Sequence, residues 1–212
     1  VIPKLNGCIG GPPVFTIVTV NPTPRIFPVL VNRIQCDSTS TAITLQSSST
    51  FTSGFVTFKY TSSAPSGLSG NTLSATGLPN GHIITDNLIN TSDGPLAVTY
   101  RVVPVSGVSC NDGPAQVFTV TVNPTPRIFP VPINSIQCDS TLTNIQLQSP
   151  STFTSGSVTF KYTATGSGAV GDITGFTATA SGLANNFTIS EKLINHTDQP
   201  QSVTYTITPV SG

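Results

Sequence analysis

The chain has 212 residues, eight basic and eight acidic side chains, and a charged fraction of 8%, against about 25% in an average soluble domain. Its length allows one large domain or two ordinary ones, each with a core of its own. So few charges, which cancel one another, exclude the basic surface that binds nucleic acid or an anionic membrane.

The first long pattern along the chain is the stretch VTVNPTPRIFP, which occurs at residues 18–28 and again at residues 120–130. The distance between equivalent residues is 102, as 123 − 21 for Asn and 138 − 36 for Cys, and it becomes 105 later, as 193 − 88 for Leu. A period near 100 is the length of a whole domain, longer than the units of solenoids. The chain therefore contains tandem domains of one family, and the second copy carries three extra residues.

Within each copy, apolar residues alternate with polar ones in the pattern of half-buried β-strands. In chain order these stretches are TAITLQ, VTFKY, VTYRV and VFTVTV, and their expected inward residues are Ile43, Leu45, Val56, Phe58, Tyr60, Val98, Tyr100, Val102, Phe118, Val120 and Val122, with Val158, Phe160, Tyr162, Val203, Tyr205 and Ile207 in the second copy. Turn signals such as LPNG and SDGP separate them at short intervals, and no stretch has a helical period. We predict an all-β fold of tandem immunoglobulin-like (PKD-like) Greek-key β-sandwiches.

The strand order of such a sandwich sets the module boundaries. VFTVTV is its last strand and NPTP is a linker, because proline removes a backbone donor and holds the chain extended. The prediction is therefore the last strand of a preceding module, or a donor strand, at residues 1–20, a complete module at 21–122 (the first module), and a module without its last strand at 123–212 (the second module). The linker residues are Asn21, Pro22, Pro24, Asn123, Pro124 and Pro126, and we expect the apolar Ile26, Phe27, Ile128 and Phe129 beside them to pack between modules.

A sandwich without its final strand leaves an open sheet edge and an uncovered core. Two explanations follow from this frame. The chain is part of a longer array, in agreement with its lack of Met, or residues 14–20 of one molecule complete the sandwich of another by strand addition. The apolar donor residues would be Val14, Phe15, Ile17, Val18 and Val20.

The pattern QCDS…IxL near the start of a module, with VTYxVxPVSGxxCxxG…FTVTVNPTP at its end, resembles the tandem PKD-like and immunoglobulin-like repeats of large secreted surface proteins from the Bacteroidota. This resemblance covers nearly the whole chain. It implies export to the cell surface and a spacing or adhesive role, as in adhesins and gliding-motility proteins. Such repeats also occur in multidomain secreted enzymes.

Four cysteines in an apparently exported chain indicate disulfides, since no C-x-x-C spacing suggests a zinc site. We favour Cys36–Cys110 within a module, which leaves Cys138 facing the copy of Cys8 from a neighbouring unit. The alternative pairs Cys8 with Cys36 and Cys110 with Cys138. A bridge needs Cα atoms within about 7 Å, and each pairing meets an objection in a simple immunoglobulin layout, so both stay open.

The tripeptide DST follows two of these cysteines. By the resemblance it matches an O-glycosylation acceptor pattern of this bacterial group, which makes Ser38 and Ser140 the candidate sites. The alternative interpretation is a turn in which Asp or Ser caps the loop that leads into the next strand.

Catalytic candidates are scarce, because the chain has seven Asp, one Glu and two His and no G-x-S-x-G or paired catalytic carboxylates. We predict no enzyme activity, no cofactor and no metal.

The expected role is an extracellular, cell-surface structural or adhesive segment that acts as a stiff spacer. The alternatives are a filament subunit joined by donor strands and an accessory binding module of a secreted enzyme. Expected partners are neighbouring copies of the module in the same or an adjacent chain, with surface glycans or a host or substratum surface as further candidates. No nucleic acid partner and no membrane span in this segment are expected.

Overall fold

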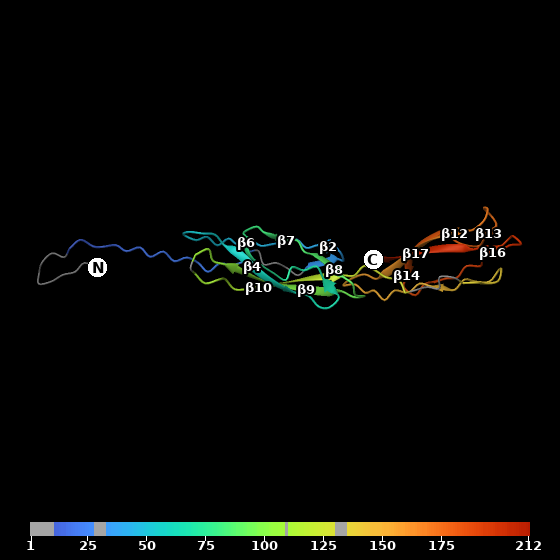
Figure 1. Ribbon diagram of the computed structural model, residues 1–212, viewed down its shortest axis with the longest axis horizontal. Coiled ribbons are helices and arrows are strands. Elements are labelled where there is room, and N and C mark those ends of the chain that lie inside the picture. The colour runs from blue at the N-terminus through green and yellow to red at the C-terminus, as the bar shows by residue number, and fades with distance from the viewer. Residues whose placement is uncertain (1–10, 28–32, 109, 130–134) are drawn as a thin grey trace.

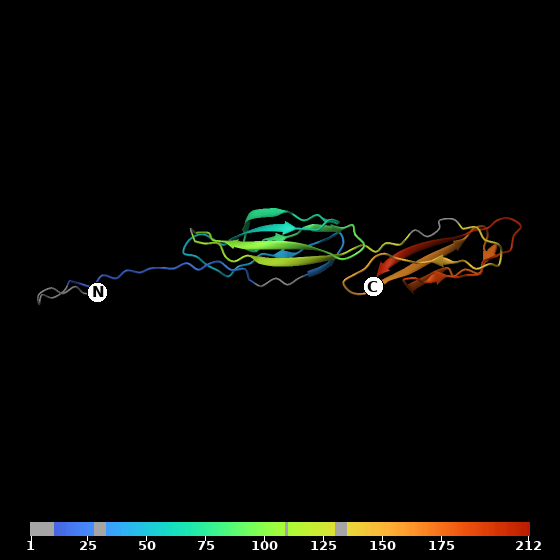
Figure 2. The same ribbon diagram turned by 90° about the horizontal axis from the view of Figure 1, so that it is seen from below.

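A computed structural model describes residues 11–27, 33–108, 110–129 and 135–212. In these residues the chain is all-β, with two β-sandwiches arranged end to end along the long axis (Figures 1 and 2). The predicted fold class is confirmed, and no helix of the described chain is long and apolar enough to cross a membrane. The module boundaries at 20/21 and 122/123 stay predictions.

The first module contains ten strands. They are β1 (Arg33–Cys36), β2 (Thr39–Ser40), β3 (Ile43–Thr44), β4 (Thr57–Ser63), β5 (Leu68–Ser69), β6 (Ser74–Pro79), β7 (Ile83–Ile84), β8 (Asn87–Asn90), β9 (Leu96–Val105) and β10 (Gln116–Asn123). Its main sheet has the order β1-β10-β9-β4-β6, in which β1 is parallel to β10 and the other neighbours are antiparallel. The shorter pairings β2-β8-β5 and β3-β7 form outside this sheet.

The core of the first module consists of the inward residues that the alternation predicts. Phe58, Tyr100 and Phe118 are at most 2% exposed, and the alternate residues Val120 and Val122 on β10 are equally buried. Burial of each such side chain stabilises the fold by about 1.5–3 kcal/mol. The register between β9 and β10 places Phe118 opposite Tyr100 and Val120 opposite Val98, so these two strands supply one continuous apolar surface.

The second module repeats part of this arrangement. Its strands are β11 (Ile145–Gln146), β12 (Val158–Gly166), β13 (Ile173–Thr174), β14 (Thr179–Ala184), β15 (Thr188–Ile189), β16 (Ile194–Asn195) and β17 (Val203–Ser211). The main sheet is β14-β12-β17, and the short pairs are β11-β15 and β13-β16. Subtraction of the repeat distance makes β12, β14 and β17 the copies of β4, β6 and β9. Residues 135–138, which are the copies of β1, form no strand in the structure.

The apolar residues of the linkers differ from their prediction. Ile26 lies in the core of the first module, and Ile128 packs against the core of the second, so neither isoleucine fills the space between modules. The next residue on each linker points the other way, and Phe27 and Phe129 are 63% and 49% exposed. The linkers are extended, so successive side chains face opposite sides. Each isoleucine therefore stabilises its own module.

An acidic side chain lies at the same place in each module, buried in the first and half-buried in the second. Asp86 of the first module is 8% exposed and accepts hydrogen bonds from the Tyr100 hydroxyl (2.6 Å), the Thr72 amide (2.9 Å) and the Thr72 hydroxyl (2.7 Å). Burial, with the hydrogen bond to the carboxylate next, raises the pKa of Tyr100. The phenol therefore stays protonated and donates at any ordinary pH.

Glu191 is the copy of Asp86 in the second module. Its carboxylate accepts hydrogen bonds from the hydroxyls of Tyr205 (2.5 Å) and Tyr162 (3.1 Å) and from the Thr177 amide (2.9 Å). Burial opposes ionisation of Glu191, but these donors outweigh it and lower the pKa of the carboxyl group. Glu191 thus joins tyrosines of the neighbouring strands β12 and β17, whereas Asp86 bonds Tyr100 alone. Both acids have a structural role.

The lowered pKa of Glu191 predicts how the second module responds to acid. A carboxyl group whose pKa is lower in the folded state adds stability above its unfolded pKa, about 4.3, and this stability is lost as the pH falls through the folded pKa. We expect Glu191→Gln to reduce the free energy of unfolding of the second module by about 1 kcal/mol at pH 7. Urea denaturation of both proteins over a range of pH measures this effect.

The difference between the two proteins should shrink steadily as the pH falls below about 4. Protonated glutamic acid and glutamine both lack the charge that the tyrosine hydroxyls stabilise. A difference that stays constant from pH 7 to strongly acidic pH would contradict the assigned role of the ionised Glu191 carboxylate.

Candidate functional site: the junction between the modules

The linker at residues 123–129 attaches the second module to the end of β10. The Asn123 side chain accepts from the Thr154 amide (3.0 Å) and donates to the Thr154 hydroxyl (3.1 Å). Further along, the amide of Phe129 donates to the carbonyl of Gln148 (2.8 Å). Proline at positions 124 and 126 holds this segment extended. The linker therefore lies along the second module as a bonded segment.

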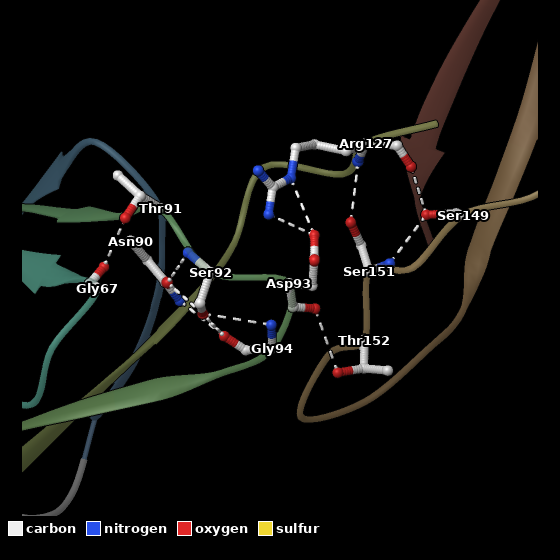
Figure 3. A network of polar contacts seen from close by, with 10 residues as sticks. All are labelled: Gly67, Asn90, Thr91, Ser92, Asp93, Gly94, Arg127, Ser149, Ser151 and Thr152. Carbon is white, nitrogen blue, oxygen red and sulfur yellow. Dashed lines mark hydrogen bonds and ion pairs between the residues drawn. The ribbon is translucent and has the colours of Figure 1, made fainter. Parts of the chain in front are cut away.

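An ion pair joins the first module to this linker (Figure 3). Asp93 lies in the turn between β8 and β9, and its carboxylate accepts from Nε of Arg127 (2.9 Å) and from a second guanidinium nitrogen. The backbone carbonyl of Asp93 also accepts from the Thr152 amide of the second module (2.7 Å). Both charged side chains are about half exposed, so the ion pair alone contributes at most about 1 kcal/mol.

The Asp93 turn is held in place by a buried amide. Asn90 is 4% exposed, and its side-chain oxygen accepts from the amide (3.0 Å) and hydroxyl (2.7 Å) of Ser92. Its amide nitrogen donates to the carbonyl of Gly94 (2.9 Å) and to the carbonyl of Val122 on β10 (2.7 Å). One side chain thus fixes both the turn that carries Asp93 and the strand that enters the linker.

The first DST tripeptide also contacts the junction. One carboxylate oxygen of Asp37 accepts from the backbone N–H of Asn90 (2.7 Å), and the other accepts from the Thr125 hydroxyl (2.8 Å). The backbone N–H of Asp37 donates to the carbonyl of Asn123 (2.9 Å). Ser38 has the left-handed φ of 58° and forms the turn between β1 and β2. The geometry supports the interpretation of this motif as a turn. Ser38 and its copy Ser140 are exposed, and their glycosylation stays a prediction.

The cysteines are not paired in the described residues. Cys36, Cys110 and Cys138 are free and exposed, and Cys8 lies outside the described residues. Cys36 is opposite Asn123 at one end of β10, whereas Cys110 precedes Gln116 at the other end. The length of this strand, about 23 Å, far exceeds the Cα separation of about 7 Å that a bridge allows. The favoured Cys36–Cys110 bridge is therefore not formed in this structure.

The N-terminal copy of the linker binds the first module in the same way. Asn21 exchanges hydrogen bonds with the amide (2.9 Å) and hydroxyl (3.1 Å) of Thr52, as Asn123 does with Thr154. The hydrogen bonds of the linker asparagine therefore repeat, whereas the burial of the prolines does not: Pro24 is buried in the first linker and Pro124, the copy of Pro22, in the second. The candidate donor residues at 14–20 form no strand and no hydrogen bond among the described residues.

The contacts described at the junction are those of an interaction between modules. Among the described residues, no group of three or more His, Cys, Asp or Glu side chains could hold a metal ion. A shallow hollow beside the first linker is lined by Phe27, Gln46, Ser47, Ser48, Asn80 and Gly81, none of which is ionisable. The sequence predicted SDGP only as a turn, and the contacts of Asp93 and Asn90 were not predicted. The repeat of Arg25 as Arg127 and of Asp93 as Asp198 is the signal that could have indicated them.

Two stretches of the chain, residues 33–126 and 135–212, match the PKD-like domain family. Among solved structures, the human desmocollin-1 ectodomain is similar over 92% of this chain and 37% of its own, at 12% identity and a TM-score of 0.38. The D0-D1 domain of intimin is similar over 85% of this chain and 90% of its own, at 13% identity and a TM-score of 0.27. The chain thus spans little more than a third of the desmocollin chain. No curated protein matches it.

The exposure of the cysteines predicts their reactivity. We expect Cys36, Cys110 and Cys138 to react with a maleimide in the native protein without prior reduction, because each is exposed and free. Peptide mass spectrometry after labelling identifies the modified residues. Recovery of a Cys36–Cys110 or Cys110–Cys138 cross-linked peptide from protein kept free of reductant would contradict this expectation.

Proposed function

The chain belongs to the PKD-like domain family, and from this premise we propose that it is a non-catalytic structural segment of a bacterial cell-surface protein, located outside the cell. It acts as a stiff rod that holds other parts of that protein apart and presents them. The polar, weakly charged composition supports an extracellular surface, and the resemblance to repeats of Bacteroidota surface proteins supports the same location.

The observation that carries this proposal is the bonded junction. The first module contacts the linker through Asp93 and Asp37, and it contacts the second module through the Asp93 carbonyl. A free linker of Gly and Ser would let the modules reorient, whereas proline and these contacts restrict them. Modules that cannot fold back on one another keep their ends apart, as a spacer requires.

The alternatives rest on different observations. A filament subunit would use the apolar residues 14–20, which form no strand among the described residues, as a donor strand. An accessory binding module would present an exposed aromatic surface to a glycan. Tyr60, Tyr100 and Tyr162 are buried and Tyr205 is half-buried, so the tyrosines serve the cores. Surface glycans and host or substratum surfaces stay candidate partners of the spacer.

The spacer role predicts a narrow distribution of distances between the modules. Spin labels on Cys36 and Cys138, with Cys8→Ser and Cys110→Ser to remove the other thiols, place one label on each module. We expect a narrow distance distribution by pulsed electron paramagnetic resonance in the parent chain. Pro124→Gly should broaden it, because glycine frees the backbone at a buried position of the junction.

Pro22→Gly is the matched control, since it makes the same change in the same sequence motif outside the junction. It should leave the distribution as in the parent chain. Labelled protein is diluted with unlabelled chain so that only distances within one molecule are measured. A broad distribution in the parent chain, or equal broadening by both substitutions, would contradict the spacer role.

A further inference from the structure

The hollow beside the first linker is built by three neighbouring segments of the first module. The backbone N–H of Phe27 donates to the carbonyl of Gln46 (2.7 Å), and on the other side the backbone N–H of Gly81 donates to the carbonyl of Leu45 (2.8 Å). Leu45 is fully buried, so the next residue, Gln46, faces outward between the other two segments. The hollow has a volume of about 220 Å³ and opens on the outer surface of the module.

One wall of the hollow is held in place by hydrogen bonds of its own. The side-chain oxygen of Asn80 accepts from the backbone N–H of Ser47 (2.8 Å), and its amide nitrogen donates to the Ser47 carbonyl (3.1 Å). The Ser47 hydroxyl accepts from the backbone N–H of Ser49 (3.1 Å). These bonds fix the polar groups of the wall before a ligand binds, which lowers the entropic cost of binding.

Other polar groups at the hollow are available to a ligand. The residues Gln46 and Ser48 are exposed, and within the described part of the chain the side-chain amide of Gln46 and the hydroxyl of Ser48 form no hydrogen bond. The amide nitrogen of Asn80 uses one N–H for the Ser47 carbonyl and keeps the second. Side-chain amides and hydroxyls both donate and accept, which matches the hydroxyl groups of a sugar.

An aromatic side chain borders these polar groups. Phe27 is 63% exposed, and its copy Phe129, which follows the complete first module, is 49% exposed. The exposure therefore belongs to this position of the repeat. A single exposed aromatic residue is ordinary on a protein surface, but this ring adjoins a hollow with free amide and hydroxyl groups. The face of an aromatic ring is apolar and electron-rich, so the C–H face of a sugar ring can pack on it.

The lining and the size of the hollow select the class of ligand. None of its lining residues is ionisable, so an anionic or cationic ligand would lose hydration without gaining a charged partner. Its volume of about 220 Å³ is below the range of about 300–1,000 Å³ for sites that hold drug-sized ligands. A neutral ligand of one ring fits these limits, and the open side leaves room for the rest of a chain in solvent.

We propose that the hollow at Phe27 is a binding site for a neutral saccharide and holds one sugar ring of a glycan. One face of the ring packs on Phe27, and the sugar hydroxyls exchange hydrogen bonds with Gln46, Ser48 and Asn80. The site adds glycan binding to the spacer role and does not depend on that role. So small and open a site should bind a single sugar with a Kd of about 1–10 mM.

The second module contains the same frame in a closed form. Asn185, the copy of Asn80, bonds to the backbone N–H (2.9 Å) and the carbonyl (3.4 Å) of Ser149. The next residue is Asn186, where the first module has glycine, and its side-chain oxygen accepts from Nε2 of Gln148 (3.1 Å). The glutamine amide that is available in the first module is thus occupied in the second.

Two differences in sequence separate the open form from the closed one. Gly81 has a left-handed φ of 87°, and a Cβ added to it would meet no atom within 4 Å. Asn186 keeps this conformation, with a φ of 73°, and adds a side chain. Pro150 replaces Ser48 and has no hydroxyl. We therefore expect the first module to bind sugar and the second not to bind it.

The first test is a titration of the 212-residue chain, followed by nuclear magnetic resonance. The probes are the methyl glycosides of glucose, galactose, mannose and N-acetylglucosamine, each to about 100 mM, which saturates a millimolar site. We expect at least one of them to cause saturable shifts of the backbone amides of Gln46, Ser48 and Gly81. Glycerol, which has hydroxyls but no ring, is the control and should cause no saturable shift.

The proposal would be overturned if none of the four sugars gave a saturable shift. It would also be overturned if glycerol shifted the same amides equally, or if the saturable shifts lay only at amides away from the hollow.

The second test closes the hollow by substitution. Gly81→Asn copies the closed form of the second module and should weaken binding of the sugar at least about tenfold. Gly77→Asn is the matched control, because Gly77 also has a left-handed φ (68°) and open space around it but does not line the hollow. Phe27→Ala removes the aromatic face and should weaken binding about tenfold. All three positions are exposed, so circular dichroism and thermal unfolding should show folded variants.

Equal loss of binding in Gly81→Asn and Gly77→Asn would overturn the proposal, and so would parent affinity in Phe27→Ala. The reverse exchange provides a gain of function. Asn186→Gly combined with Pro150→Ser should produce sugar-dependent shifts at the backbone amide of Gln148, which the parent chain should not show. A folded double variant without these shifts would contradict the assigned roles of the free glutamine amide and the serine hydroxyl.

Discussion

The structure depends on the pairing of β10 with β9. This pairing covers the apolar surface of Val98, Tyr100 and Val102, supplies the neighbour that β1 needs, and delivers the chain at Asn123 to the next module. Asn90 connects these roles, because its amide binds both the carbonyl of Val122 and the turn that carries Asp93. Closure of one core and attachment of the next module are therefore coupled. A loss of β10 would loosen the junction as well as the core that it covers.

Identical sequences can have different surroundings, and the two linkers illustrate this point. Pro124 is buried, whereas Pro22, in the same NPTPRIF context, is exposed. Arg127 pairs with Asp93, while Arg25 makes no ion pair among the described residues.

The alternation of apolar residues and the repeat distance predicted the fold class and nearly every core position, since both depend on spacing along the chain. Polar contacts between distant turns could not be predicted in this way. The Asp93–Arg127 pair joins residues 34 positions apart. The tyrosines that bond to Asp86 and Glu191 lie on other strands, so the sequence did not indicate these pairs. The predicted Cys36–Cys110 bridge is not formed in the structure, because the parallel pairing of β1 with β10 places Cys36 at the end of β10 that is opposite to Cys110. Ile26 entered its own core because the linker pairs with the module that follows it.

The parallel arrangement of β1 and β10 has a mechanical consequence. The chain enters the first module before β1 and leaves it after β10, and the two strands are aligned over four residue pairs, from Arg33 opposite Val120 to Cys36 opposite Asn123. A pulling force along the rod therefore loads these inter-strand bonds in shear, together, and does not peel them apart singly. Under tension the first module should therefore hold until these four residue pairs separate together.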